Sequence, residues 1–567
     1  MTAGAWRHSA GIIRANIWSY GSSVAFYIGF FALALAPGLI NRAIFDALSG
    51  HARAGVNVWT LIGLVIGVEF GRFGLQYFGG VLFNVFYYSS EALLKRNMMS
   101  WLVGGPGPRV LPGSPGEAVS RFRDDTLETV GFSTVMIVSP QVLTGAVAFA
   151  IMLRINAQIT VVIVAPMMAT VALTYLVSRR IQGYRKIARE ATAAVTSFIG
   201  ETFGAVQSIK LAAAEVRVAQ HLKVLNEHRR RASIRDLMFS SVLTFLNTNI
   251  ASVASGCVLL LAAQAMRRGT FTVGDFTLFA SYLAMVSAAP LLVGQILALE
   301  RQSGVSIERM RSLMDGSAPL SLVAGSAPAP ASPRAVAPLR TLKVRGLSCR
   351  HPGVGRGVED IDLDLDRGRF VVITGRVGAG KTTLLRALLG LIPRDGGAIL
   401  WNGETVDDPA TFMVPPRCAY TSQTPRLFSE SLKDNILMGA AVSDDLLAGA
   451  VSLAVFGQDV AGFDAGLETL VGTRGVTLSG GQLQRAGAAR MFIRHADLLV
   501  FDDISSALDT PTEQELWRGL FKDGRRACLA VSHRRAAFLL ADEIVLLDEG
   551  RIRARGDAAT LRAQSPL

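Results

Sequence analysis

The feature that most constrains this chain is the uneven distribution of its apolar residues. Of its 567 residues, 50% are hydrophobic, and before about residue 310 they form long continuous runs. After about residue 340 they form short alternating or helical patterns instead. Because an apolar run of about 20 residues can cross a bilayer as a helix, the sequence predicts a helical membrane half followed by a soluble half.

Six apolar spans are predicted in the membrane half. They lie near residues 23–45, 59–88, 134–152, 159–177, 237–265 and 276–299. Residues 1 to about 18 carry Trp, Ile and Arg in a pattern that predicts an amphipathic helix at the membrane interface. An even number of spans places both termini on the same side of the membrane.

The connection between the fourth and fifth spans, residues 179–236, is strongly basic. It holds twelve Lys and Arg residues against five acidic residues, and its pattern is helical almost throughout. Since connections rich in Lys and Arg stay on the cytosolic side, both termini are predicted to be cytosolic. The net charge of +13 is explained by Lys and Arg residues in such cytosolic connections, so no nucleic-acid partner is expected.

Two charged residues, Glu69 and Arg72, lie three residues apart inside the second predicted span. Charges within a span often line a cavity. The favoured alternative is a self-neutralising pair near the outer interface, because Glu69 is only about ten residues into the run. Asn247 and Asn249 in the fifth span could contact a substrate or hold helices together.

The soluble half has the pattern of a single α/β domain. Residues 316–339 are rich in Pro, Ala, Gly and Ser, and they are predicted to be a linker. Strand and helix patterns alternate after it. The predicted domains are therefore a membrane domain at 1–315, the linker, and an α/β domain at 340–567. The four cysteines form no CxxC pair and suit a reducing compartment.

A phosphate-binding loop lies between a predicted strand and a predicted helix of this domain. The apolar run 370–373 enters a glycine-rich turn at 375–380, and a helical pattern follows. Glycines let backbone N–H groups surround phosphate oxygens, and a helix N-terminus adds positive potential. Lys381 is then expected to reach the β- and γ-phosphates, and the Thr382 hydroxyl to ligate Mg²⁺.

Further segments carry chemistry when they are taken together. Residues 478–482, Leu-Ser-Gly-Gly-Gln, open a helical run and form a second anion-binding surface. Residues 498–503 form a strand that ends in two carboxylates, which could hold Mg²⁺ and orient water, or simply form a turn. Gln423 and His533 each follow a predicted strand, at the edge where α/β sheets bind ligands. A lone histidine there could also be structural.

The order of these motifs resembles the ATP-binding cassette family. With six preceding spans and long cytosolic helices, the whole chain is similar to a type I (B-family) ABC exporter half-transporter. The resemblance implies an all-α polytopic membrane domain with six transmembrane helices followed by an α/β P-loop NTPase domain. It implies an ATPase that exports a substrate by alternating access in the inner (plasma) membrane. The substrate, expected to be amphipathic and lipid-like or peptide-like, is not identified.

The resemblance also implies a role for each motif residue. The nucleotide-binding residues would be His351, Gly375, Gly378, Gly380, Lys381, Thr382, Thr383, Ser479, Gly480, Gly481 and Gln482. The catalytic residues would be Asp503 as the base, His533 and Gln423, and the Mg²⁺ ligands would be Thr382, Gln423 and Asp502. The signature residues Ser479 to Gln482 would face ATP bound to the opposite subunit. Residues 115–125 and 211–217 match the positions of the coupling helices.

Three positions depart from the family pattern. Asp503 stands where the catalytic base is usually Glu, and its side chain is shorter by about 1.5 Å. A retracted carboxylate should slow hydrolysis, because a base must reach the attacking water. His351 stands where an aromatic residue usually stacks on adenine, and Thr473 stands where many exporters carry Glu.

The chain holds one phosphate loop and one signature motif, so the resemblance implies a second half-transporter as partner. A heterodimer is favoured over a homodimer, because degenerate sites are familiar in heterodimeric exporters. An alternative of a different class is an ATP-binding regulatory or gating subunit with very low hydrolysis, which Asp503 alone supports. The expected cofactors are ATP and Mg²⁺, and the other partners are the lipid bilayer and the substrate.

Overall fold

The computed structural model describes residues 2–50, 57–104, 115–314, 318, 320–324, 337–350, 355–472, 476–522 and 526–564. The chain divides into two compact units. The first unit comprises Met1–Trp101 and Leu111–Ala327, and the second comprises Leu102–Val110 and Pro328–Leu567.

The first unit is helical. Its helices are α1 (Thr2–Ala15), α2 (Ile17–Leu33), α3 (Ala36–Leu48), α4 (Val58–Gly104), α5 (Pro115–Ser120), η1 (Arg121–Asp125), α6 (Thr126–Ser133), α7 (Val135–Val138), α8 (Pro140–Ile155), α9 (Ala157–Gly204), α10 (Val206–Leu211), α11 (Glu215–Arg267) and α12 (Val273–Leu313). Among the described residues, Ile17–Leu48 and Val58–Gly104 are long and apolar enough to cross a membrane. Shorter apolar helical stretches occur at Pro140–Ile155, Ala157–Pro166 and Val273–Ala288.

Proline divides two of the predicted spans into shorter helices. The first span was expected as one helix over 23–45, but α2 ends at Leu33 and α3 begins at Ala36 with Pro37 in its first turn. The third span likewise breaks between α7 and α8, where Pro140 is the first helical residue. Proline is tolerated in a first turn, where its missing N–H has no partner to lose.

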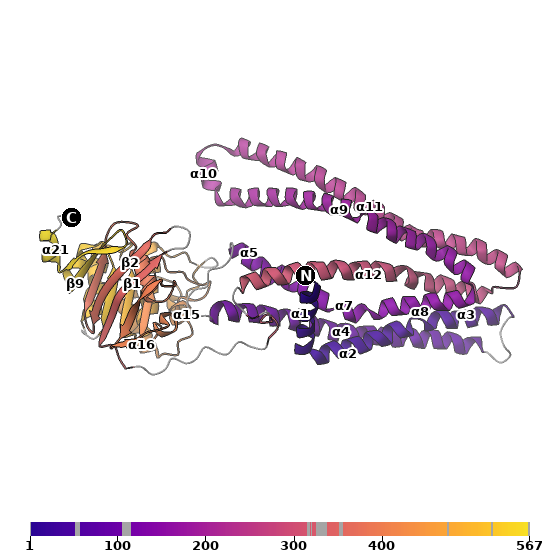
Figure 1. The fold of residues 1–567 in the computed structure, drawn as a ribbon, viewed down its shortest axis with the longest axis horizontal. Helices are drawn as coiled ribbons and strands as arrows, with labels where there is room; N and C mark the ends of the chain where they lie inside the picture. The colour runs from indigo at the N-terminus through magenta and orange to yellow at the C-terminus, as the bar shows by residue number, and fades with distance from the viewer. Residues whose placement is uncertain are drawn as a thin grey trace. The chain divides into compact units, whose positions relative to one another are not determined.

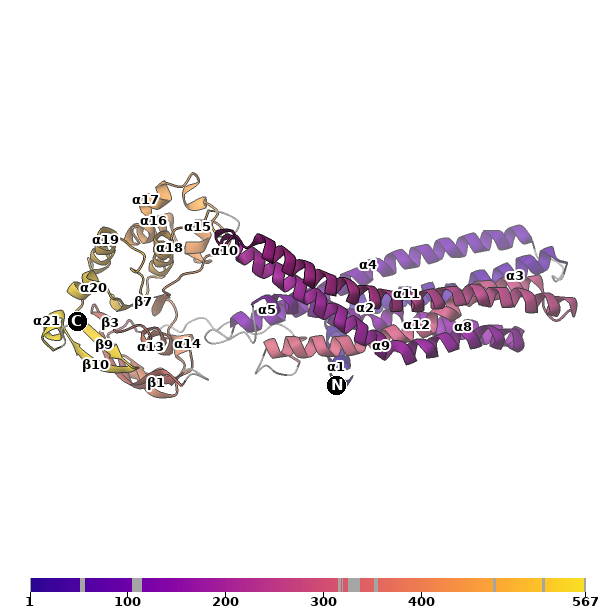
Figure 2. The same ribbon diagram turned by 90° about the horizontal axis from the view of Figure 1, so that it is seen from above.

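Helices α9 and α11 form a long antiparallel pair joined by α10 (Figures 1 and 2). They contain 48 and 53 residues. At 1.5 Å per residue, each is roughly 70–80 Å long, more than twice the roughly 30 Å of a hydrocarbon core. Both helices therefore extend well beyond the thickness of a membrane.

Helix α12 packs against α3 and α8 through a close contact. The Tyr282 hydroxyl donates to the Leu35 carbonyl oxygen at 2.7 Å. Its ring lies against Gly38, where an added Cβ would come within 2.4 Å of Tyr282 Cε1. Gly38 is thus required by the approach of an aromatic ring rather than by its own backbone angles.

The charged pair of the second predicted span and Asn249 of the fifth each bond within their own helix. Arg72 donates to both carboxylate oxygens of Glu69 at 2.8 and 3.0 Å, and its guanidinium lies 4.9 Å from the Phe30 ring centre. This supports the interpretation of a self-neutralising pair. The Asn249 amide donates to the carbonyl of Phe245 at 2.9 Å. The Asn247 side chain lies outside the described residues.

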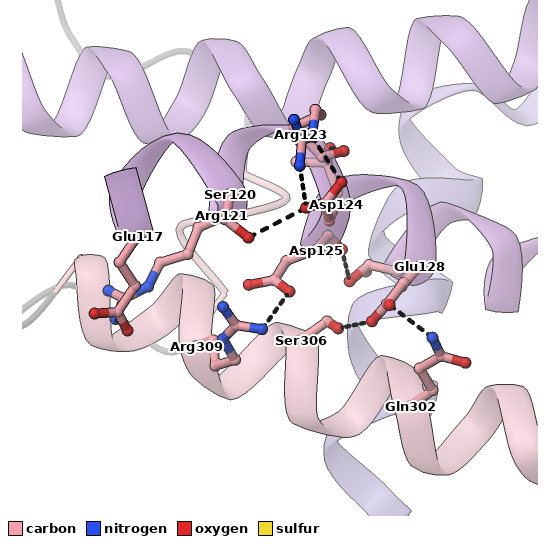
Figure 3. A network of polar contacts seen from close by, with 12 residues as sticks. Glu117, Ser120, Arg121, Arg123, Asp124, Asp125, Glu128, Gln302, Ser306 and Arg309 are labelled. Atoms are coloured by element: carbon pink, nitrogen blue, oxygen red, sulfur yellow. Dashed lines mark hydrogen bonds and ion pairs between the residues drawn. The ribbon is translucent and has the colours of Figure 1, made fainter. Parts of the chain in front are cut away.

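A polar network joins η1 and α6, which precede the third predicted span in the chain, to α12 (Figure 3). Arg309 of α12 lies 3.2 Å from Asp125, whose carboxylate is buried. Glu128 accepts hydrogen bonds from Gln302, at 2.6 Å, and from Ser306. The chain at 121–125 forms a π-helical turn, a feature that often marks functional positions.

Both ends of the predicted linker are packed where they are described. Asn97 donates to the carbonyl oxygens of Leu322 and Ala324 at 2.8 Å each. At the other end, the Trp401 indole donates to the Ala337 carbonyl at 3.3 Å. The middle of the predicted linker lies outside the described residues, and the bounds of the domains stay a prediction.

The second unit is an α/β domain (Figure 1). Its elements are β1 (Thr341–Arg350), β2 (Gly357–Asp366), β3 (Phe370–Thr374), α13 (Lys381–Leu388), β4 (Gly396–Trp401), β5 (Glu404–Thr405), α14 (Pro409–Phe412), β6 (Cys418–Thr421), α15 (Leu432–Leu437), α16 (Asp444–Leu453), α17 (Gly457–Ala461), η2 (Gly466–Glu468), α18 (Gly480–Phe492), β7 (Leu498–Asp502), α19 (Thr510–Phe521), β8 (Ala527–Val531), α20 (Arg535–Leu540), β9 (Glu543–Asp548), β10 (Arg551–Gly556) and α21 (Ala558–Gln564).

The described strands of this unit form two sheets. A four-stranded antiparallel sheet has the order β2-β1-β4-β5, and a six-stranded sheet has the order β10-β9-β3-β8-β7-β6. Strands β9, β3, β8, β7 and β6 run parallel, so their carboxyl ends meet at one edge. Every residue of β3, β7 and β8 is buried, as expected when both faces of a parallel sheet are covered.

Candidate nucleotide-binding site

The phosphate-binding loop connects β3, in the middle of the larger sheet, to α13. Gly380 is the N-cap of α13 with φ +96°, a left-handed conformation that favours glycine. Gly375 has φ +147°, and a Cβ there would lie 2.0 Å from the Leu547 carbonyl oxygen. These two glycines therefore allow the chain to turn sharply and to present backbone donors at the start of α13.

Lys381 is held by the loop itself. Its Nζ donates to the carbonyl oxygens of Gly375 and Arg376 at 2.8 Å each. Burial lowers the pKa of Lys381 below its ordinary value, while Asp503 and Asp502 act in the opposite direction. The ammonium group is thus fixed in the loop where a phosphate would lie.

Asp502 ends β7 and lies next to Thr382. The Thr382 hydroxyl donates to Asp502 Oδ1 at 3.1 Å, and the Tyr420 hydroxyl lies 3.5 Å from Oδ2. Asp502 is only 2% exposed, and burial raises its pKa, opposed first by the Thr382 hydrogen bond. A hydroxyl and a carboxylate this close together are the oxygen ligands that Mg²⁺ prefers, so the residues present fit that ion.

Asp503 follows in a left-handed conformation with φ +55°, which Asp adopts more readily than most residues. Gln423 Nε2 donates to Asp503 Oδ2 at 3.2 Å. Burial raises the pKa of Asp503, and the nearby His533 opposes this rise. Burial also lowers the pKa of His533. A carboxylate with a raised pKa is the stronger proton acceptor, as a general base requires.

These side chains line one cleft of about 370 Å³. The cleft brings together Gly378, Gly380, Lys381, Thr382, Thr383, Gln423, Asp502, Asp503 and His533 from the predicted residues. It is also lined by Arg356, Gly357, Val377 and Val531, which sequence reasoning missed. His351 lies outside the described residues. The only signal in the sequence that could have indicated Arg356 is its positive charge a few residues after His351, the expected base-stacking residue.

The signature residues are arranged at the start of α18. Ser479 is its N-cap, and its hydroxyl oxygen accepts from the Gln482 N–H at 3.3 Å. In return, the Ser479 N–H donates to Gln482 Oε1 at 2.9 Å. This reciprocal pair is a capping box. Ser479, Gly480, Gly481 and Gln482 are not among the described residues that line the cleft. Thr473 lies outside the described residues.

Gln484 links three segments of the site and was also missed. It is 4% exposed, and its amide donates to the Ser506 hydroxyl at 2.8 Å. It also donates to the Gln423 carbonyl at 3.3 Å and accepts from the Ala507 N–H at 3.0 Å. The segments after β6 and β7 are therefore bonded to the signature helix.

Comparisons with known proteins match both units. The family model described as the ABC transporter transmembrane region matches residues 24–289, and that described as ABC transporter matches residues 358–506. An ATP-dependent lipid A-core flippase of Bordetella pertussis is 27% identical over 98% of this chain and 91% of the relative. The flippase of Chromobacterium violaceum is 26% identical over 84% of this chain and 81% of the relative.

A solved structure has the same fold. It is described as a bacterial Atm1-family ABC exporter with ATP bound, and it matches with a TM-score of 0.77. The match covers 97% of this chain and 96% of that structure at 19% identity. A helical membrane region followed by an α/β nucleotide-binding domain is thus the architecture of both.

Proposed function

This chain belongs to the ABC transporter family, and from that premise we propose that it moves a lipid-like substrate across the inner membrane. Members of the family with this architecture are multi-pass membrane ATPases that couple ATP to export and work as dimers. The observation that supports a lipid-like substrate is the alignment of flippases for lipid A-core along 98% of the chain. Both termini are proposed to be cytosolic, because the 179–236 connection is basic.

The proposed roles of the site residues follow from their contacts. Lys381 leaves its two loop carbonyls to bind the β- and γ-phosphates of ATP. Thr382 and Asp502 are the proposed ligands of Mg²⁺, which supplies positive charge beside these phosphates when it is bound. Gln423, whose amide N–H donates to Asp503, is the third proposed ligand of Mg²⁺.

The proton of the attacking water is proposed to pass to Asp503, which the Gln423 amide holds at the cleft by a hydrogen bond. His533 is proposed to contact the γ-phosphate. Ser479 to Gln482 face away from this cleft in function and donate to the nucleotide of the partner subunit. The coupling-helix assignments at 115–125 and 211–217 are part of the same proposal.

The lipid proposal is tested with the purified protein in proteoliposomes. We expect ATP-dependent movement of a fluorescent lipid A-core glycolipid, and stimulation of ATPase activity by that lipid. Lys381→Ala should abolish both, because it removes the phosphate-binding ammonium group. ATPase activity without movement or stimulation by any lipid would reject the substrate class and leave the ATPase intact. ATPase activity unchanged in Lys381→Ala would instead reject the proposed phosphate site.

A second candidate function is an ATP-binding regulatory or gating subunit that hydrolyses very slowly. The observation that favours it is the short carboxylate of Asp503, tied to Gln423 at 3.2 Å. Asp503→Glu would extend the carboxylate by about 1.5 Å. Since a misplacement of about 1 Å can reduce a rate about 100-fold, we expect the turnover number of ATP to rise about tenfold or more.

The matched control is Asp360→Glu, because Asp360 is also an aspartate with positive φ, at +54°. It reports the strain of placing Glu in this conformation, without a change in the cleft. The regulatory function would be rejected if the unmodified protein hydrolysed ATP rapidly and Asp503→Glu hydrolysed it more slowly. That result would show that the short side chain of Asp503 does not limit the rate of hydrolysis.

We propose a heterodimeric assembly, supported by Asp503 alone, with the partner supplying the faster site. The chain expressed by itself should then fail to form a dimer with high ATPase activity. Chemical crosslinking and ATPase measurement on the purified chain distinguish the alternatives. A stable homodimer with high turnover would contradict the heterodimer.

A further inference from the structure

The nucleotide cleft is lined from two sides of the phosphate-binding loop. On one side, β8, β7 and β6 follow β3 in the sheet, and they bring His533, Asp502, Asp503 and Gln423. On the other side lie β9 and β10 of the same sheet, and beyond them the first residues of β2. The two carboxylates, Asp502 and Asp503, are therefore on the first side, and Asp502 lies there beside Thr382 of α13.

A close backbone junction fixes the start of β2 against the loop. The Gly550 N–H donates to the Ala379 carbonyl at 3.1 Å, and its own carbonyl accepts from the Glu359 N–H at 2.9 Å. A Cβ on Gly550 would lie 2.4 Å from the Gly357 carbonyl oxygen, and one on Gly380 would lie 3.1 Å from the same atom. The chain just before Gly357 is thus held at the rim of the cleft.

Arg356 occupies that position. Its side chain is exposed and lines the cleft. Within the described residues, no hydrogen bond or ion pair engages its guanidinium. Two neighbouring arginines differ in this respect, because Arg350 and Arg551 pair with Glu359 at 3.7 and 3.0 Å. Arg356 is therefore an uncommitted cation at the end of the cleft that lies opposite the carboxylates.

We propose that Arg356 binds the phosphates nearest the base of the bound nucleotide, the α-phosphate above all. This inference rests on the proposed ATP site, in which Lys381 and the Mg²⁺ ligands take the β- and γ-phosphates. Asp502 stands at the end of β7 and Lys381 and Thr382 at the start of α13, so the base-proximal phosphate is expected on the remaining side, toward β2. A guanidinium matches a phosphate with paired N–H donors and is always charged.

This contact would also compensate for His351, the unusual residue at the expected base-stacking position. His351, which precedes Arg356 by five residues, offers less stacking area than Tyr or Phe would. A charge-assisted contact to the adjacent phosphate adds affinity that does not depend on the base. The site would then select nucleotides mainly by their phosphates rather than by their base, so ATP and GTP should bind with similar affinities.

The test is the affinity of the full-length protein for MgATP and MgADP, measured by calorimetry for Arg356→Gln and Arg356→Lys. Both nucleotides contain the α-phosphate, so Arg356→Gln should weaken both by about tenfold, the effect of one charged hydrogen bond. Arg356→Lys, which keeps the charge but not the paired donors, should lose less. The matched control Arg551→Gln removes the same charge from the same surface outside the cleft, and it should bind both nucleotides normally.

Two outcomes would overturn the proposal. One is unchanged affinity of Arg356→Gln for both nucleotides, and the other is a loss confined to MgATP, which would place the guanidinium at the γ-phosphate. A different result would show that the proposed ATP site itself is wrong. In that case the unmodified protein would not bind MgATP, or Lys381→Ala would bind it normally.

Discussion

Replacing Arg309 by alanine should destabilise the membrane unit because it leaves Asp125 buried without its partner. Asp125 is 1% exposed, its Oδ1 lies 3.2 Å from Arg309, and its Oδ2 has no hydrogen-bond partner among the described residues. Breaking a fully buried ion pair costs about 3–5 kcal/mol. The Arg309 side chain is 43% exposed, so solvent screening reduces the expected loss to about 2 kcal/mol.

The loss should depend on pH in a defined direction. Burial already raises the pKa of Asp125, and Arg309 is the largest influence that lowers it. Without Arg309 the folded-state pKa rises further above the unfolded value, so the folded state binds the proton more tightly. Stability then recovers as the pH falls through the raised pKa. The difference between Arg309→Ala and the unmodified protein should be largest at neutral pH and smaller at pH about 5.

Thermal unfolding in detergent, followed by tryptophan fluorescence, measures this effect. Trp6 is a local reporter, since its ring packs on Phe132 of α6 with centres 4.9 Å apart. For a unit of this size, a loss of about 2 kcal/mol corresponds to a decrease in Tm of roughly 3 °C. Asp125→Asn in the Arg309→Ala background removes the unpaired charge and should restore much of the loss. An Arg309→Ala decrease that is absent, or equal at both pH values, would refute the reasoning.

Three further substitutions give separate expectations. Gly380→Ala should reduce MgATP affinity at least tenfold, because a Cβ at φ +96° would lie 2.8 Å from Val358 Cγ1; calorimetry showing normal binding would contradict this. Ser479→Ala removes the acceptor of the Gln482 N–H and should lower stability by about 1 kcal/mol, whereas Ser479→Thr should retain it in thermal unfolding. Gln484→Leu removes the side-chain partners of the Gln423 carbonyl and the Ala507 N–H and should reduce ATP turnover more than MgATP affinity, so equal losses in both measurements would argue against a linking role.

The local motifs could be predicted from the sequence because their partners are close along the chain. The capping box of Ser479 and Gln482 spans three residues, and the turn from β3 into α13 is encoded by consecutive glycines and Lys381. The apolar runs likewise predict membrane helices, since each helix satisfies its own backbone hydrogen bonds. Helix ends were less predictable where Pro37 and Pro140 begin a new helix inside an apolar run.

Contacts between distant parts of the chain were not predictable. Arg356 reaches the cleft only because β2 docks against Gly380 and Gly550, and the second of these is almost two hundred residues away. Asp125 and Arg309 are also far apart in sequence, and no local pattern pairs them. No pattern in residues 115–125 indicated the π-helical turn at 121–125.

The capping box at the start of α18 has a further consequence for what that helix can meet. A serine hydroxyl has one proton to give and two lone pairs to offer. In Ser479 one lone pair is already engaged by the Gln482 N–H, while no described acceptor takes the proton. The free N–H groups of the first helical turn point the same way. The donors at the start of α18 are therefore already aligned for an anion before any partner binds.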